Sequence, residues 1–155
     1  MLPILLAILA RLLLVLLFFP FSALDKALNF SLATQQAQAQ AGNPRLARLL
    51  IVCGLGVEVF MSLGVLTGVA DRLAALVLAL YCIVTAVLWK QFWREPDFGL
   101  VGVSNGREVF WDFLKNLAVA GGFLMLAFGA SASSAQAFLD APFASSRPYR
   151  LGGSS

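Results

Sequence analysis

The sequence of 155 residues contains no histidine and only two cysteines. The lack of histidine excludes haem with two histidine ligands, histidine-rich metal sites and histidine acid–base catalysis. Cys53 and Cys82 form no CxxC motif, which excludes a thioredoxin-like dithiol. We therefore expect no metal site, and no cofactor bound covalently or through histidine.

Charge is also scarce, since only 12% of the residues are charged and 60% are hydrophobic. A soluble domain carries about 25% charged residues, so this chain has too little polar surface to cover a water-facing globule. The net charge is +3, and no basic stretch is long enough to follow a phosphate backbone. The composition excludes nucleic acid as a partner and indicates an integral membrane protein in a lipid bilayer.

The apolar residues fall into four runs, each near the roughly 20 residues that cross a hydrocarbon core. They predict an all-α fold, an antiparallel bundle of four transmembrane helices over residues 1–130, at about 3–28, 45–66, 72–92 and 108–129. A cleaved signal peptide is the alternative for the first run. No basic residue precedes Arg11 and the run is too long, so we expect an uncleaved helix.

The segments between and after the spans are more polar. Residues 34–42 form a Gln/Ala-rich connection, 67–71 a tight turn with Gly68 as the helix stop, and 95–106 a polar loop. Residues 131–155 form a Ser/Ala/Pro-rich C-terminal tail, in which 135–139 have the composition for a short helix.

The distribution of basic residues favours one orientation. Four antiparallel spans put both termini on the same side, together with Arg11, Arg72, Arg147 and Arg150. The opposite side collects Lys26, Arg45, Arg48, Lys90, Arg94, Arg107 and Lys115. Because basic loops stay in the cytoplasm, the termini are expected in the periplasm.

Arg11 and Glu58 are the charged residues that lie furthest inside apolar runs. Each is eight residues from the same expected membrane boundary, which is about 12 Å of helix. Because a lone charge at that depth is costly, we predict an Arg11–Glu58 pair. The pair either fixes the helix register or forms a polar pocket for a quinone headgroup or a proton.

Two further sets of residues are candidates. The first is an interfacial polar cluster at the ends of the first and fourth spans: Asp25, Lys26, Asp112, Lys115 and Asn116. Anchoring at the membrane surface is its simplest role. The second is Cys53 with Cys82, placed symmetrically about the 67–71 turn. They are either a thiol pair or two separate buried thiols.

Three segments resemble the DoxX family of small four-helix bacterial membrane proteins, over about residues 8–129. The first is Ala-Arg-Leu-Leu-Leu at 10–14, followed by Lys26. The second is Glu-Val-Phe-Met-Ser-Leu-Gly at 58–64, followed by Gly68, Arg72, Ala74 and Ala75. The third is Phe-Leu-Lys-Asn-Leu at 113–117, followed by Gly121 and Gly122. Each segment is mostly apolar. Their order, their spacing and the four-span frame carry the resemblance.

The resemblance implies a multi-pass protein of the bacterial inner (plasma) membrane that is associated with redox systems. Relatives include the small membrane subunit of a thiosulfate:quinone oxidoreductase and a component of an oxidoreductase complex that handles thiol stress. The polar positions that it carries over are Arg11, Glu58, Arg72, Lys115 and Asn116. Two departures argue against carrying over catalysis: residues 89–92 lack the histidine found in many relatives, and the Gln/Ala-rich connection looks like an insertion.

Together these features predict an accessory subunit without catalytic activity of its own. It would pack through its helices and tail against a larger membrane electron-transfer complex, near a quinone. The alternative is a quinone-reactive oxidoreductase subunit with a polar pocket at Arg11 and Glu58. A small transporter is a third hypothesis, for which the sequence shows no inverted repeat. The small molecules expected to bind are a quinone or a lipid.

Overall fold

The computed structural model describes residues 1–150, apart from the side chain of Gln40, and this range is helical without any strand. It contains four helical stretches long and apolar enough to cross a membrane: Leu2–Leu28, Pro44–Thr67, Asp71–Arg94 and Asn105–Phe128. The predicted all-α membrane fold with four spans is therefore confirmed.

The first span is a continuous apolar run but not a straight helix. It consists of α1 (Leu2–Val15), a π-helical turn (Leu17–Ser22) and α2 (Ala23–Leu28). Pro20 lies inside the turn, and Phe19 before it has extended backbone angles (φ −126°, ψ 119°). Proline has no N–H to donate and disfavours a helical residue before it, so the helix is interrupted here. The span predicted at about 3–28 is present as Leu2–Leu28, and the helix within it is interrupted at Pro20.

The Gln/Ala-rich segment is the first clear departure from the sequence prediction, because it is a helix rather than a loop. It forms α3 (Phe30–Ala41), which ends at Gly42 in the left-handed conformation and packs against α4 (Pro44–Thr67). Alanine and glutamine are good helix formers. Ala37 of α3 and Ala47 of α4 are both buried, so their small side chains let the two helices approach closely.

The remaining spans are α5 (Asp71–Trp89), followed by a 3₁₀ turn (Phe92–Arg94), and α6 (Asn105–Phe128). The C-terminal segment then forms α7 (Ala132–Asp140), which begins with a capping box between Ser131 and Ser134. The residues after α7, up to 150, return to the bundle instead of leaving it as a free tail. The expected linker-like tail is thus, as far as it is described, an ordered part of the fold.

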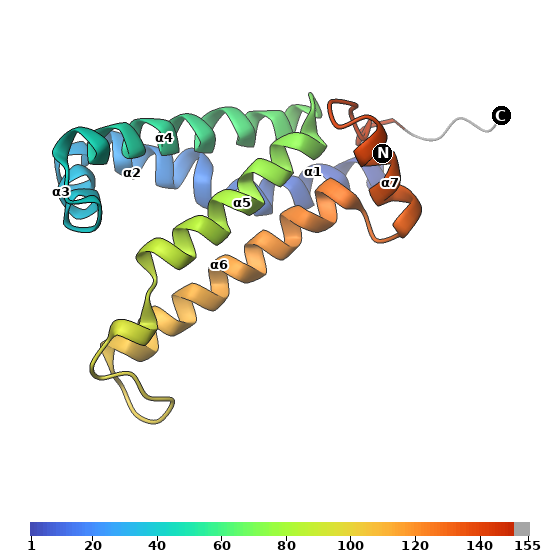
Figure 1. Cartoon of the computed structure of the whole chain (residues 1–155). Helices are drawn as coiled ribbons and strands as arrows, with labels where there is room; N and C mark the ends of the chain where they lie inside the picture. The colour runs from blue at the N-terminus through green and yellow to red at the C-terminus, as the bar shows by residue number, and fades with distance from the viewer. Residues whose placement is uncertain (151–155) are drawn as a thin grey trace.

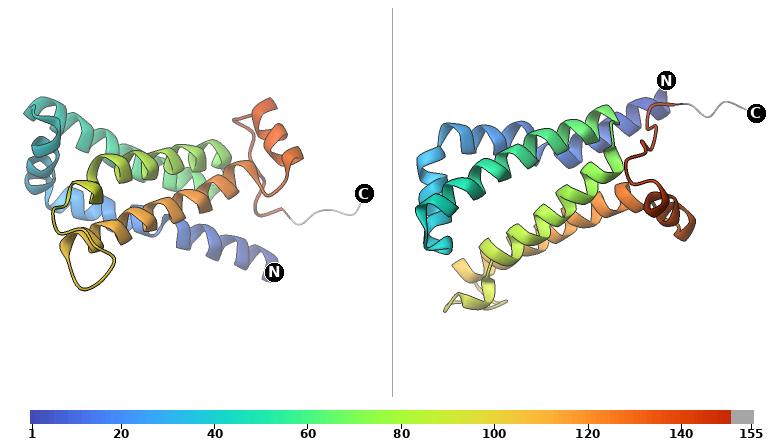
Figure 2. Two further views of the ribbon diagram at one scale, coloured as in Figure 1. Left: turned by 60° about the horizontal axis from the view of Figure 1, so that its bottom comes forward. Right: turned by 45° about the horizontal axis from the view of Figure 1, so that its top comes forward.

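Figure 1 shows how the spans are arranged. The first span lies beside α4, and α5 lies beside α6. The two pairs meet near the α4–α5 turn and separate toward α3 and the loop before α6. The N-terminus and α7 both lie at the end where the pairs meet, which we call the termini end. The opposite end is the α3 end. The views in Figure 2 show the same grouping.

The core sits near the termini end, where the pairs converge. Its buried residues come from all four spans: Val15, Phe18, Val65, Ala74, Ala75, Leu78, Ala79, Cys82, Ala120, Phe123 and Ala127. Small residues let the helices come close. A Cβ added to Gly64 would lie 3.0 Å from the Cβ of Ala74 and 3.2 Å from the carbonyl oxygen of Val69. Neither atom can move without moving the α4–α5 turn.

We therefore expect Gly64→Ala to destabilise the bundle by about 1–3 kcal/mol, as overpacking does in a dense core. Thermal unfolding in detergent measures the effect. The matched control is Gly56→Ala on the same helix, because a Cβ there meets nothing within 4 Å. Replacing that helical glycine is expected to stabilise by up to about 1 kcal/mol. Equal stability of the two variants would contradict the packing described here.

Candidate functional site

Two groups of polar side chains are built around the buried charges of the bundle, Arg11 with Asp71 and Glu58. The first, the Arg11 centre, consists of Arg11, Asp71 and Ser146. Arg11 is only 5% exposed and Asp71 is fully buried. One arginine nitrogen, Nη1, donates to the carbonyl oxygen of Val65 at 2.6 Å, and Nη2 donates to Oδ2 of Asp71 at 2.6 Å. The charge of Arg11 is thus neutralised by the first residue of α5.

Ser146 completes the Arg11 centre from the C-terminal segment. Its backbone N–H donates to Oδ1 of Asp71 at 2.9 Å, and its hydroxyl donates to Oδ2. Arg11 also donates to that hydroxyl oxygen at 2.9 Å. Both oxygens of the Asp71 carboxylate therefore accept hydrogen bonds, and residues that are 135 positions apart in the chain are held together.

Arg72 and Tyr149 fasten the same end of the protein. Arg72 donates to the carbonyl oxygens of Ala127 at 2.7 Å and Ser134 at 2.6 Å, and its guanidinium lies over the ring of Phe138. The hydroxyl of Tyr149 donates to the carbonyl oxygen of Leu66. These contacts tie α5, α6 and the C-terminal segment to one another, so the role of Arg72 here is to join helix ends.

The second group, the Glu58 centre, consists of Glu58, Lys26, Ser22 and Tyr81. Glu58 is 1% exposed, and its Oε1 accepts from all three partners: from Lys26, from Ser22 at 3.1 Å and from Tyr81 at 2.8 Å. Lys26 also donates to the Ser22 hydroxyl at 2.8 Å. Ser22 and Lys26 are one helical turn apart, so both face α4 just after the interruption at Pro20.

Two buried oxygens of the Glu58 centre have no partner among the described residues. They are Oε2 of Glu58 and the hydroxyl oxygen of Ser62, one turn further along α4. Ser62 is fully buried. Because an unsatisfied buried acceptor costs about 1–3 kcal/mol, two on the same face of one helix favour a bound hydrogen-bonding molecule. We include Ser62 in the Glu58 centre.

The predicted pairing of Arg11 with Glu58 is wrong, although both residues are buried. Arg11 lies level with Val65, which is seven residues, about 10 Å, from Glu58 along α4. The prediction counted both residues from one common membrane boundary. The first span is interrupted at Pro20, and its start does not coincide with the end of α4. Each charge therefore meets a different partner.

The predicted interfacial cluster is divided in two. Lys26 turns inward to Glu58, and Asp25 accepts a hydrogen bond from Asn29 on its own helix. At the start of α6, Asp112 pairs with Lys115 at 3.2 Å and with Lys90, the end of α5, at 3.0 Å. Asn116 donates to the backbone oxygen of Asp112. Lys115 lies at the surface, with its side chain 73% exposed.

The two thiols do not face a common interface. Cys53 is exposed on α4, whereas Cys82 is fully buried in the core of the bundle, and both are free. The condition for a thiol pair, that both residues face the same side, is not met. Within residues 1–150 there is also no group of three or more acidic or cysteine side chains that could hold a metal ion.

Several residues of the two centres were missed by the sequence prediction. Asp71 looked like a turn residue, and Ser22 and Tyr81 looked like single polar residues in apolar runs. A usable signal was a repeated spacing of four residues, which places two polar side chains on one face of a helix. It occurs twice, in Ser22 with Lys26 and in Glu58 with Ser62. Nothing local in the sequence points to Ser146.

The fold and its buried ion pairs define a small multi-pass helical membrane protein. Within that class the chain belongs to the DoxX family, because the DoxX family model matches residues 6–91, more than half of the chain. The resemblance found in the sequence is thus confirmed. The matched range includes both ion pairs but not Ser146. No curated protein and no solved structure matches the chain.

From the hydrogen bonds of the Arg11 centre we predict that Asp71→Asn strongly lowers the free energy of unfolding and loosens the nearby C-terminal segment. The substitution leaves Arg11 buried without a counter-charge, so we expect a loss of about 3–5 kcal/mol of unfolding free energy. We also expect faster hydrogen exchange of residues 141–149. Unfolding in detergent and exchange followed by mass spectrometry measure the two effects.

Asp112→Asn is the matched control for this variant. Its ion pairs are partly exposed, so the same chemical change should cost about 1 kcal/mol or less. Ser146→Ala separates the roles further: it should loosen residues 141–149 while the Arg11–Asp71 pair remains. Unchanged exchange in both Asp71→Asn and Ser146→Ala would refute the attachment of the C-terminal segment.

Proposed function

We propose that this DoxX protein is an accessory subunit of a bacterial membrane electron-transfer complex. The observation that carries the proposal is the firmly attached C-terminal segment. Arg72 and Ser146 fix it on the bundle, and it presents Leu139 (66% exposed) and Phe143 (76% exposed) to the outside. Apolar side chains held in a fixed position bind a partner with little loss of conformational entropy.

The helices support the same proposal. On α4, the residues Ala47, Leu50, Gly54 and Glu58 follow one face at helical spacing. Ala47, Gly54 and Glu58 are buried, yet Leu50 on the same face is 38% exposed. An apolar helix of a larger subunit, packed against α4 and α5 at the α3 end, would cover this part of the face.

The orientation that goes with the proposal places the termini end in the periplasm. The α3 end carries more basic residues, and two of those at the termini end, Arg11 and Arg72, are bound to neighbouring helices. Since the excess of lysine and arginine marks the cytoplasmic side, α3 would face the cytoplasm of the inner membrane. Leu139 and Phe143 would then meet a periplasmic part of the partner, or the outer surface of the membrane.

The test is purification of the tagged full chain from its own bacterium in a mild detergent, followed by native mass analysis. We expect stoichiometric recovery with subunits that carry haem, flavin or iron–sulfur groups. The double variant Leu139→Ser/Phe143→Ser should lose most of this partner, because it removes apolar contacts that are about 1–3 kcal/mol each. Recovery of the wild-type protein without any redox subunit would rule the proposal out.

Val101→Ser/Val103→Ser provides the control for this experiment. Both valines are more than 90% exposed, but they lie in the loop before α6 at the α3 end. Like Leu139→Ser/Phe143→Ser, this variant replaces two exposed apolar side chains with serine. Unlike it, it leaves the C-terminal segment unchanged. Retention of the partner by the control and loss by the test variant assigns the docking surface to Leu139 and Phe143.

A second candidate function is favoured by the two unpartnered oxygens of the Glu58 centre. In this alternative, the protein is a quinone-reactive subunit whose pocket lies at Glu58 rather than at a pair with Arg11. A quinol hydroxyl can donate to Oε2 of Glu58, and the Ser62 hydroxyl can donate to a quinone carbonyl. These groups suit a quinone headgroup, which supplies the redox chemistry when bound, while the chain's own residues orient it.

Binding of a short-chain quinone analogue to the purified protein tests this alternative. If it is correct, Ser62→Ala weakens binding of the quinone by about 2–10-fold, the value of one hydrogen bond, and Glu58→Gln weakens binding of the reduced quinol by a similar factor. Ser31→Ala is the control, because Ser31 is exposed on α3. Equal affinities of Ser62→Ala and Ser31→Ala would exclude the Glu58 centre as the quinone site.

A further inference from the structure

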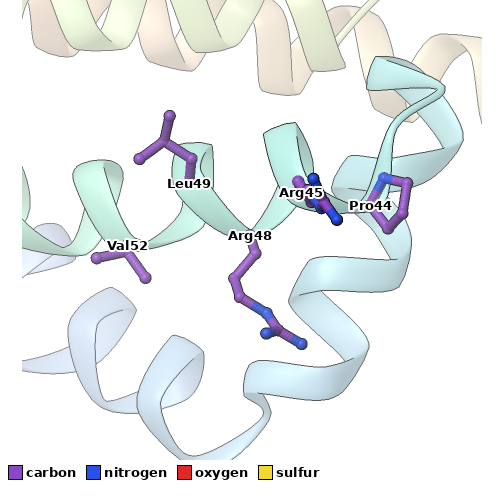
Figure 3. Close-up of a pocket in the computed structure, with 5 residues that line it drawn as sticks. All are labelled: Pro44, Arg45, Arg48, Leu49 and Val52. Atoms are coloured by element: carbon purple, nitrogen blue, oxygen red, sulfur yellow. The ribbon is translucent and has the colours of Figure 1, made fainter.

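An open cavity of about 440 Å³ lies at the α3 end, on the exposed surface of the start of α4, and is separate from both buried centres. Its lining residues are Pro44, Arg45, Arg48, Leu49 and Val52. Figure 3 shows the Arg48 side chain extending from α4 toward the neighbouring helices of the N-terminal part.

The lining residues have an order that matches an amphiphile in a membrane. Arg45 and Leu49 are four residues apart, and so are Arg48 and Val52, so each arginine has an apolar side chain one turn deeper. The helix that is long and apolar enough to span the membrane begins at Pro44, so we expect the arginines at the level of the lipid headgroups. Below them Leu49 and Val52 are 58% and 52% exposed, so they face the acyl chains.

The two arginines are free to bind an anion. Among residues 1–150, neither guanidinium forms an ion pair, whereas the nearby cations Lys26 and Lys90 are paired with Glu58 and Asp112. The helix terminus itself is already occupied, since the Asn43 side chain accepts from the backbone N–H groups of Arg45 and Leu46. Any anion here is therefore recognised by the side chains of Arg45 and Arg48.

We propose that this cavity binds an anionic phospholipid of the surrounding bilayer. The lipid phosphate accepts hydrogen bonds from Arg45 and Arg48, whose planar guanidinium groups match phosphate oxygens in pairs. One acyl chain lies along Leu49 and Val52. Basic pockets beside membrane helices on the cytoplasmic side bind anionic headgroups in this way. The site does not depend on the partner complex or on a quinone, so it stands apart from the proposed function.

The test is native mass spectrometry of the delipidated full chain, titrated with phosphatidylglycerol and, separately, with phosphatidylcholine of the same acyl chains. Both lipids carry the phosphate, but the choline ammonium offsets its charge in phosphatidylcholine. We therefore expect the wild-type protein to bind phosphatidylglycerol about tenfold or more tightly than phosphatidylcholine. In Arg45→Gln/Arg48→Gln, the affinity for phosphatidylglycerol should fall to that for phosphatidylcholine. Both arginines are exposed, so the thermal unfolding temperature in detergent should stay unchanged.

Arg94→Gln/Arg107→Gln is the matched control, because it removes the same charge from the same end of the protein but outside the cavity. This variant should still bind phosphatidylglycerol more tightly than phosphatidylcholine. Loss of the preference in this control as well would show a general effect of positive charge and overturn the site. A competition with free glycerol phosphate distinguishes the lipid from its headgroup. Displacement of phosphatidylglycerol by an equal concentration of glycerol phosphate would also overturn the proposal, because the acyl chain would then contribute nothing.

Discussion

The ion pair between Arg11 and Asp71 is the interaction on which the convergent end of the bundle depends. A charged side chain inside a membrane is tolerated only when its hydrogen-bonding groups are satisfied by the protein. Arg11 meets this requirement with a carboxylate from α5, a backbone oxygen from α4 and a hydroxyl from the C-terminal segment. One buried cation thereby fixes the relative positions of four parts of the chain.

The Glu58 centre meets the same constraint in a different way. Its charge is matched by Lys26 and its Oε1 is saturated by hydrogen bonds, but Oε2 and the neighbouring Ser62 are left open. The Arg11 centre is closed and joins structural elements, whereas the Glu58 centre has remaining capacity for a ligand. This difference in hydrogen-bond saturation is the reason why the second candidate function is placed at the Glu58 centre and not at the Arg11 centre.

The fold was largely predictable from the sequence, because four apolar runs separated by polar residues leave few arrangements in a bilayer. The burial of Arg11 and Glu58 was also predictable, since their flanking residues on both sides are apolar. Their partners were not, because partner choice depends on the interruption at Pro20 and on where each span starts. The role of Ser146 depends on a chain reversal after α7, which has no local signature.

The sequence separation within the Arg11 centre has a consequence for biosynthesis. Asp71 follows Arg11 by 60 residues, and Ser146 follows it by 135. At about 5–20 residues per second, the ribosome needs roughly 3–12 s to deliver the aspartate after the arginine. The first span therefore enters the membrane with an uncompensated cation. It acquires its counter-charge only with the third span, and its hydrogen bond with Ser146 only after a further 75 residues have been made.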